Sequence, residues 1–254
     1  MVSLLGQRAL VTGGSRNLGA VIAHELAAAG ASVAVNYRSS EADASRVVDS
    51  LHLADGAQHA SVRGDVTRVG DIQPIADAAS DRLGGPIDIL VNNAGPYLST
   101  PFVHMEIADF DEIWDASVRS IYLLAQAVVP GMRAIGSGRI INVSASSAYV
   151  RNRSIYTVAN ASVITLTEQL AVELAPTVLV NAVAPGQIHE SLEELRELAP
   201  AWADDVLRKT PLDRLATRRD VARVVLQLCG TAFDAVTGVT IPVDGGLRLR
   251  TNET

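Results

Sequence analysis

A glycine-rich segment near the N-terminus has the residue types and spacing needed to hold a phosphate group. It lies between a β-branched run and an alanine-rich stretch, and it reads Thr12, Gly13, Gly14, Ser15, Arg16, Asn17, Leu18 and Gly19. Glycines permit a tight turn and let the backbone approach a pyrophosphate, which the N-terminus of a following helix attracts. Asn17 stands among these glycines, and asparagine tolerates left-handed backbone better than most residues.

The elements that must position this segment alternate along the chain. We expect strands at 8–12, 32–36, 60–64, 87–92, 138–144, 178–184 and 239–243. We expect helices at 17–29, 41–55, 69–83, 109–133, 155–174 and 219–228. This alternation predicts an α/β fold: a Rossmann-type, doubly wound parallel sheet of about seven strands with helices on both faces. One domain is expected over 1–254, with a substrate lid at about 187–211.

Composition argues against several functions. The net charge is −7 without a basic block, so nucleic acid is not an expected partner. Cys229 is the only cysteine and the five histidines are scattered, so we expect no disulfide and no metal. We find no signal peptide and no apolar run of membrane-spanning length, so we expect a cytoplasmic protein without a membrane partner. Lys209 is the only lysine, so any chemistry that needs an amine must use it.

Four further motifs stand in the order found in short-chain dehydrogenases/reductases, and the glycine-rich segment resembles that family's TGxxxGxG. They are Asp65-Val66, Asn92-Asn93-Ala94-Gly95, Pro185-Gly186 and Val243-Asp244-Gly245-Gly246. The chain is identified as an atypical member of the classical family. The resemblance implies that a nicotinamide dinucleotide is bound by Gly13, Ser15, Arg16, Asn17, Leu18, Gly19, Arg38, Ser39, Asp65, Val66, Asn92, Ala94, Gly95, Pro185, Gly186 and Ile188.

Cofactor choice in this family depends on the charge beside the adenosine ribose. The second expected strand leads into Arg38-Ser39, with no acidic residue of the kind that holds the 2′-hydroxyl of NAD. Arg16 can reach the same place, and a guanidinium grips a phosphate with two oriented donors. We therefore expect NADP(H). The alternative is that Arg16 and Arg38 are solvated surface residues.

The resemblance also implies a catalytic set of Asn, Ser, Tyr and Lys. In the family, the tyrosine donates a proton to the carbonyl oxygen, and the lysine lowers the pKa of that tyrosine. Tyr156 matches the tyrosine at the start of the helix expected over 155–174, but Asn160 stands where the lysine belongs. Asn160 has no positive charge, so it does not lower the pKa of Tyr156 electrostatically.

The family's serine and asparagine are replaced as well. The segment GRIINVSA resembles the family's GRIVNISS and puts Ala145 in the place of the serine that orients the substrate oxygen. Ser144 and Ser146 flank Ala145, and a slip of one residue would present either of them. Ser117 lies thirteen residues before Pro130, where the family has an asparagine that anchors a proton-relaying water. Only Tyr156 therefore matches the set cleanly.

Residues near the predicted nicotinamide end are expected to face the substrate: Tyr97, Tyr149, Gln187, His189 and Glu190. A pocket lined by aromatic side chains suits a bulky or cationic ligand. Two alternatives remain for this group. His189 can be a solvated loop residue, and Glu190 can be the first acid of an amphipathic lid helix.

Three functions remain open from the sequence. The one we favour is an NADPH-dependent reductase of a pre-activated acceptor, such as an iminium or a hemiaminal that loses water to give one. A cation that gains hydride becomes a neutral amine and needs no proton on oxygen. The second is an ordinary carbonyl (keto) reductase whose proton relay is rebuilt with Arg151 or Arg153. The third is a non-catalytic NADP(H)-binding sensor or structural partner, in which Tyr156 is kept for packing.

The expected partners are a small-molecule substrate and further copies of this chain. Segments 109–133 and 155–174 resemble helices that pair between subunits in this family. Their alanine, valine and leucine content allows helices to pack closely. We therefore expect a homodimer or a homotetramer.

Overall fold

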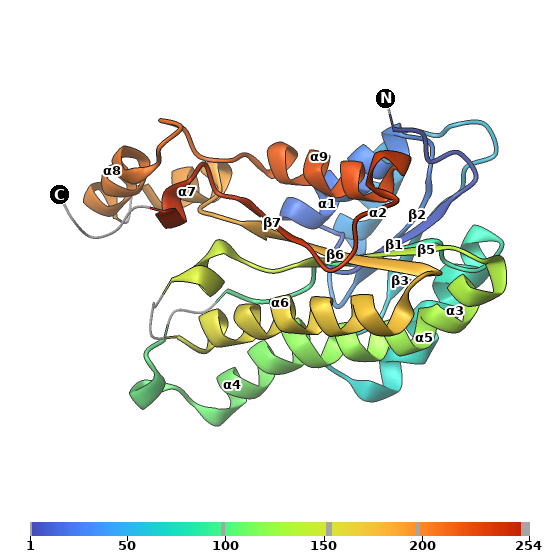
Figure 1. The fold of residues 1–254 in the computed structure, drawn as a ribbon, viewed down its shortest axis with the longest axis horizontal. Coiled ribbons are helices and arrows are strands. Elements are labelled where there is room, and N and C mark those ends of the chain that lie inside the picture. Colours follow the sequence, from blue (N-terminus) through green and yellow to red (C-terminus); the bar gives the residue numbers. More distant parts are fainter. Residues whose placement is uncertain (1, 98–99, 151–153, 197–198, 250–254) are drawn as a thin grey trace.

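A seven-stranded sheet, parallel throughout, forms the centre of the computed structural model (Figure 1), which describes residues 2–97, 100–150, 154–196 and 199–249. The strands are β1 (Arg8–Val11), β2 (Ser32–Tyr37), β3 (His59–Arg63), β4 (Ile89–Asn92), β5 (Gly138–Val143), β6 (Val178–Pro185) and β7 (Thr240–Val243). Their order in the sheet is β3-β2-β1-β4-β5-β6-β7. The predicted Rossmann-type parallel sheet is confirmed.

Helices cover both faces of this sheet (Figure 1). One layer consists of α1 (Asn17–Ala28), α2 (Glu41–Ser50) and α9 (Arg218–Cys229). The other consists of α3 (Val69–Leu83), α4 (Ile107–Trp114), α5 (Ser120–Ile135) and α6 (Ile155–Leu174). The bounds predicted for the helices at 69–83 and 155–174 are confirmed.

The two layers exist because the central strands are apolar on both faces. Successive side chains of a strand point to opposite faces of the sheet. Leu10 and Leu90 accordingly pack into the core under α3, α5 and α6, whereas Val11 and Val91 pack into the core under α1 and α9. Strands buried on both faces are typical of parallel sheets, and they bring the carboxyl ends of β1, β4, β5 and β6 to one edge.

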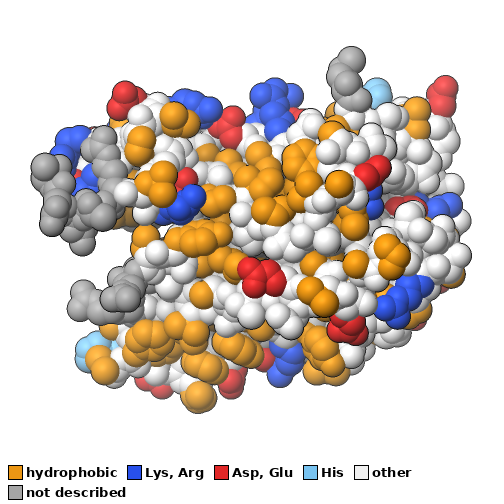
Figure 2. Space-filling model, in the orientation of Figure 1, with side chains coloured by type: hydrophobic (Ala, Val, Ile, Leu, Met, Phe, Trp, Pro, Cys, Tyr) orange, Lys and Arg blue, Asp and Glu red, His pale blue; other side chains and the backbone are white. Residues whose placement is uncertain are grey.

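The segment 187–211, which we call the lid segment, is more regular than its sequence indicates. It contains α7 (His189–Arg196) and α8 (Pro200–Lys209). These helices share a small core of their own, in which Leu192 packs with Ala203 and Val206. In the space-filling view (Figure 2), the surface is hollowed on the side of the molecule where α7 and α8 lie.

Two predicted helices differ from the structure. The helix predicted over 41–55 ends at Ser50, because Leu51 turns to extended backbone and buries its side chain. The helix predicted over 109–133 is divided into α4 and α5 by a π turn over Asp115–Arg119. Ser120, the first residue of α5, donates its hydroxyl to the Ala116 carbonyl of this turn at 2.6 Å. A π turn inside an α-helix often marks a functional site.

Candidate active site

The turn between β1 and α1 forms a tightly packed backbone cradle. Asn17 adopts the left-handed conformation with a φ of 50°, as its place among the glycines suggested. A Cβ atom on Gly19 would lie 2.3 Å from the Gly13 carbonyl oxygen and 2.6 Å from Asn93 Nδ2. Asn93 Nδ2 donates to the carbonyls of Thr12 at 3.0 Å and Gly13 at 3.3 Å, so the loop after β4 fixes this turn.

The N-terminus of α1 fits a pyrophosphate. Arg16 is the N-cap residue, and its side chain does not cap the first turn of α1. The backbone N–H groups of that turn therefore remain available to an anion, which the helix dipole favours. The predicted cofactor residues Gly13, Ser15, Arg16, Asn17, Leu18 and Gly19 lie together in this turn.

A cavity of about 640 Å³ lies beyond the carboxyl ends of β2 and β3. Its lining consists of Arg38, Arg63, Gly64, Asp65, Arg68, Asp71 and Pro74. Three arginines thus surround it, a favourable arrangement for a phosphate. Arg63 and Arg68 were missed by the sequence reasoning. The signal was the position of Arg63, which is paired with Tyr37 in the sheet and so lies beside Arg38.

The other residues predicted at the adenosine end are placed differently. Asp65 accepts hydrogen bonds from the backbone and hydroxyl of Thr67, at 3.0 and 2.8 Å. Val66 packs into the core beneath α3, and Ser39 is exposed. Arg16 is exposed and is not among the residues that line the cavity. Arg38 is therefore the predicted arginine that the fold brings to this cavity.

Arg38 forms an ion pair across the fold. Its Nη1 lies 3.1 Å from Oε1 of Glu112 in α4, and both side chains are about half exposed. An exposed pair of this kind contributes at most about 1 kcal/mol to stability. A phosphate carries more charge and can take over the guanidinium, so this pair does not conflict with anion binding.

A chain of buried amides connects β4 to α6. Asn92 Nδ2 donates to Asn142 Oδ1 at 2.8 Å, and Asn142 Nδ2 donates to Thr167 Oγ1 at 2.9 Å. Asn92 Oδ1 is buried and accepts no hydrogen bond from the described residues. A buried acceptor without a donor is costly, so this oxygen at the carboxyl end of β4 fits a ligand that donates to it.

Tyr156 lies in the first turn of α6, and its ring meets that of Tyr97 edge to face. The ring centroids are 5.0 Å apart and the planes are inclined by 77°. Burial raises the pKa of Tyr156 to about 12, Tyr97 adds to this increase, and the Asn160 side chain offsets part of it. Asn160 Nδ2 donates to the backbone carbonyl of Tyr156 at 2.8 Å. The phenol is therefore neutral at physiological pH.

The serines around Ala145 face different parts of the fold. The Ser144 hydroxyl donates to the backbone carbonyl of Asn160 at 2.9 Å, so it is engaged with α6. Ser146 Oγ lies 3.5 Å from the position that a Cβ atom on Gly186 would take. Ser147 Oγ, which the sequence reasoning missed, is buried without a hydrogen-bond partner among the described residues. Ser146 and Ser147 are thus the hydroxyls free to meet a ligand here.

Ser117 and Gly95, two of the positions predicted from motifs, lie close together near this edge. Ser117 is buried in the π turn, and a Cβ atom on Gly95 would lie 3.2 Å from its hydroxyl oxygen. The predicted residues Ala94 and Gly95 follow β4, and the backbone N–H of Ala94 donates to Thr12 Oγ1 at 3.1 Å. The fold therefore brings Ser117 beside the loop that supports the cradle.

The residues predicted to face a substrate follow β5 and β6. Tyr149 is 44% exposed, and the guanidinium of Arg248 stacks over its ring. His189 is exposed and Gln187 is half-buried. Ile188, which was predicted to bind the cofactor, forms an isolated bridge with Ala216. Tyr149, Gln187 and His189 stay predictions as substrate residues, and Ile188 stays a prediction as a cofactor residue.

Glu190 is engaged with a neighbouring helix. Its carboxylate accepts hydrogen bonds from the backbone N–H of Arg218, at 3.1 and 3.2 Å. Arg218 is the first residue of α9, where a negative charge is favourable to the helix dipole. This contact gives Glu190 a structural role at the N-terminus of α9.

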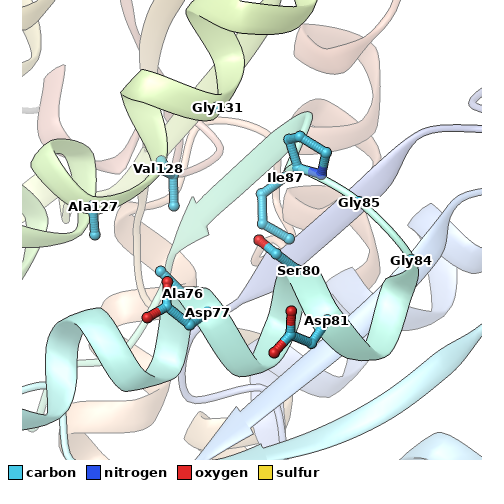
Figure 3. A pocket seen from close by; sticks show the side chains of 11 residues that line it. Ala76, Asp77, Ser80, Asp81, Gly84, Gly85, Ile87, Ala127, Val128 and Gly131 are labelled. Carbon is cyan, nitrogen blue, oxygen red and sulfur yellow. The ribbon is translucent and has the colours of Figure 1, made fainter.

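A second cavity, of about 460 Å³, is lined by side chains of α3 and α5 (Figure 3). It is formed between α3 and α5, beside the Gly84–Ile87 loop that leads into β4, so it opens at the amino end of the sheet. Within the part of the chain that the structure describes, no three His, Cys, Asp or Glu side chains form a possible metal site. No described helix is both long and apolar enough to cross a membrane.

Comparison with known proteins agrees with this geometry. Residues 13–248 match the family model described as enoyl-(acyl carrier protein) reductase. The chain is 35% identical to a 3-oxoacyl-[acyl-carrier-protein] reductase of Synechocystis, over 97% of this chain and 99% of that protein. It superposes on a Burkholderia cenocepacia gluconate 5-dehydrogenase in complex with NADP and tartrate, with a TM-score of 0.88, 30% identity and 98% of each chain covered.

A 7α-hydroxysteroid dehydrogenase complexed with NADH and 7-oxo glycochenodeoxycholic acid gives a TM-score of 0.89 at 34% identity, covering 96% of this chain and 95% of that one. The chain belongs to the classical short-chain dehydrogenase/reductase family. It is an oxidoreductase of that type, and members similar to it hold either NADP or NADH.

Proposed function

We propose that this protein is an NADP(H)-dependent reductase that acts on a pre-activated acceptor, such as an iminium or a hemiaminal. The observation that carries the proposal is Tyr156: a neutral phenol with a pKa of about 12, followed four residues later by an uncharged amide. Such a phenol is a poor base, which disfavours the oxidation of an alcohol. It remains a hydrogen-bond donor that can orient an acceptor.

Different residues would bind the cofactor and contact the acceptor in such a reaction. The tightly packed cradle at Gly13–Gly19 would hold the pyrophosphate, and Asn92 Oδ1, which has no donor among the described residues, would accept a hydrogen bond from the cofactor at the end of β4. NADPH, when bound there, supplies a hydride. Ala145 offers no hydroxyl to a carbonyl oxygen, and the Ser144 hydroxyl is already engaged with α6. An iminium that accepts hydride becomes a neutral amine, so the missing proton relay costs this reaction little.

The arginines of the larger cavity support NADP(H) over NAD(H). Arg38, Arg63 and Arg68 place three cations where a 2′-phosphate is expected. Asp65 and Asp71 also line this cavity, but Asp65 is bound to Thr67, and Asp71 accepts the backbone N–H of Asp65 at 2.9 Å. The superposed gluconate 5-dehydrogenase holds NADP, which is consistent with this choice.

Replacing Arg38 with alanine tests the cofactor choice. We expect NADPH affinity to fall by about 10- to 100-fold, because a charge-assisted bond to phosphate is lost. NADH affinity should change less than about threefold. Fluorescence titration with both cofactors measures this, and Arg133→Ala, at the far end of α5, is the control. Equal losses for NADH and NADPH would contradict the assignment.

Ordinary carbonyl reduction is the second candidate. The relative from Synechocystis is a 3-oxoacyl-[acyl-carrier-protein] reductase, and the Ser146 hydroxyl beside the Gly186 loop is the group that would bind a carbonyl oxygen in this candidate. Arg151 and Arg153, which would rebuild the relay in this candidate, lie outside the described residues.

Tyr156→Phe separates the two candidates. For an iminium acceptor we expect kcat/KM to fall less than about tenfold, because the phenol only orients the acceptor. For a ketone, losing the proton donor should cost at least about 100-fold. A panel of cyclic imines and matched ketones with NADPH measures both. A variant that loses imine turnover as severely as ketone turnover overturns the proposal, while NADPH binding without any turnover indicates a sensor or structural partner.

We also propose a cytoplasmic homodimer or homotetramer that pairs through α4, α5 and α6. Hydrophobic side chains gather along the lower edge of the molecule, over the part in which Figure 1 places α4 (Figure 2). The exposed apolar side chains are Ile107 and Phe110 on α4, Tyr122 on α5, and Val158 and Val172 on α6. Close packing of such faces buries apolar surface. Light scattering in solution tests this, and a monomeric mass contradicts it.

A further inference from the structure

Arg248 and Tyr149 form a cation–π pair that neither the sequence motifs nor the proposed hydride transfer uses. Tyr149 ends the 3-10 turn η3 (Ser146–Tyr149), and Arg248 lies in the 3-10 turn η5 (Leu247–Leu249). The guanidinium carbon of Arg248 is 5.0 Å from the centroid of the Tyr149 ring. A guanidinium stacked on an aromatic face is held in a defined plane, with its donors pointing out along the edge.

This pair belongs to the same edge of the sheet as Tyr156 and the predicted nicotinamide end. η3 follows β5, and η5 follows β7, which pairs with β6. A Cβ atom on Gly186 would lie 2.5 Å from Cβ of Asp244 and 3.5 Å from Ser146 Oγ. Asp244 in turn lies 3.6 Å from Arg248 Nε. The contacts therefore run from Gly186 through Asp244 to Arg248 and back to η3.

The Nε side of the Arg248 guanidinium faces Asp244, while its two terminal nitrogens have no partner among the described residues. Asp244 is 5% exposed at its side chain, and its carboxylate also accepts the backbone N–H groups of Gly246 at 2.9 Å and Arg248 at 3.3 Å. Nε of Arg248 is buried and donates no hydrogen bond to the described residues, so the 3.6 Å ion pair is its contact with Asp244. Its two terminal nitrogens donate no hydrogen bond to the residues that the structure describes. The Arg248 side chain is 28% exposed, so these donors can be reached from solvent.

The position of Arg248 changes which ligands the ring of Tyr149 can bind. Tyr149 was a candidate to attract a cationic ligand, but its face is already taken by the cation of Arg248. A second cation on that ring would meet a like charge. An anion, in contrast, would meet two outward donors of a positively charged, preoriented fork. The face of Tyr149 covered by Arg248 therefore favours a negatively charged group over a cationic one.

We propose that Arg248, held by Tyr149 and Asp244, binds a carboxylate on the acceptor. This inference rests on the proposed reductase function and narrows its substrates to imino or oxo compounds that carry a carboxylate. Arg248 is then a specificity-determining residue, and Tyr149 positions its guanidinium. The positive charge of an iminium lies at the reacting end of such a substrate, and the carboxylate lies at the Arg248 end.

Direct binding of a simple carboxylate tests the site without any turnover. Benzoate and benzamide have the same shape but differ in charge, and saturation-transfer NMR measures weak binding of each to the NADPH-saturated protein and to the protein alone. We expect benzoate to bind at least about tenfold more tightly than benzamide. Arg248→Gln should remove that preference, while Arg248→Lys should keep part of it.

Two further variants make the outcome unambiguous. Arg223→Gln, an exposed arginine on α9, is the matched control and should keep the benzoate preference. Tyr149→Leu keeps Arg248 but removes its support, and should weaken benzoate binding. Thermal melting shows that each variant is folded. If benzoate binds no better than benzamide, or equally well to Arg248→Gln and Arg223→Gln, the inference is overturned.

Kinetics then separate this inference from the proposed function. With NADPH, wild-type protein should show a lower KM for a 1-pyrroline that carries a propanoate chain at C2 than for 2-propyl-1-pyrroline, and Arg248→Gln should raise the KM of the carboxylate alone by at least about tenfold. Failure to bind NADPH defeats the proposed function but leaves the benzoate result to decide the anion site. Turnover of both imines with no effect of Arg248→Gln keeps the function and defeats the anion site.

Discussion

Replacing Gly19 with alanine is expected to reduce NADPH affinity by at least about 100-fold, equivalent to roughly 2.7 kcal/mol. The added Cβ atom would lie 2.3 Å from the Gly13 carbonyl oxygen and 2.6 Å from Asn93 Nδ2. Neither neighbour is the end of a flexible chain, because Asn93 is held by the carbonyls of Thr12 and Gly13. The turn must therefore open, and its N–H groups lose their common direction. Fluorescence titration with NADPH measures the loss.

The matched control is Gly70→Ala in the first turn of α3. A Cβ atom at Gly70 meets nothing within 4 Å, so the substitution should leave NADPH affinity unchanged. Alanine is also the better helix former, by up to about 1 kcal/mol, so the control protein should melt no lower than wild type. If Gly19→Ala binds NADPH as tightly as Gly70→Ala does, the cradle is not the pyrophosphate site.

The second large effect is expected from Asn160→Lys, which restores a cation four residues after Tyr156. A positive charge near the phenol favours its ionised form and lowers the pKa of Tyr156 from about 12. We expect ketone reduction to rise at least tenfold, roughly the lower range of general acid catalysis. Iminium reduction should fall, because the new charge repels a cationic acceptor. Steady-state rates on matched ketones and imines measure both changes.

The pH dependence follows from the same pKa. In wild-type protein the pKa of the phenol is about 12, so its ionisation should not lower the reduction rate between pH 7 and pH 10. In Asn160→Lys the pKa is lower, so the reduction rate should begin to fall at a lower pH. Asn160→Met removes the amide without adding charge, and it should show neither the gain on ketones nor the shifted profile. A gain in Asn160→Met equal to that in Asn160→Lys would refute the electrostatic explanation.

The architecture was predictable from the sequence because local signals agreed with the fold. Apolar runs bounded by glycine predicted the strands and most helix ends, and Gly84 ends α3 with a left-handed φ of 74°. The π turn at 115–119 was not predictable, because the apolar periodicity continues through it. The end of α2 was missed because Leu51 follows Val47 and Val48 at helical spacing, although the backbone at Leu51 is already extended.

Only those parts of the candidate site that belong to a local sequence motif were predictable from the sequence. The cradle and Tyr156 are read directly from local sequence. Glu112 and Arg248 reach the site from distant elements, and no local pattern indicates that they contact Arg38 and Tyr149. The direction of the Ser144 hydroxyl is likewise set by the packing of α6 against β5. These contacts depend on tertiary structure and appear only when the chain is folded.

The buried amide chain from Asn92 through Asn142 to Thr167 has a consequence for how this scaffold can change. Each of these side chains has a specific partner, so an apolar replacement leaves an unsatisfied group in the core. The alignment of β4, β5 and α6 is therefore held by residues that do not touch the acceptor. The residues at positions 145 and 160 can then both be substituted while β4, β5 and α6 keep their alignment. A scaffold built in this way is evolvable: new acceptor chemistry can be installed on it without refolding the part that binds the cofactor.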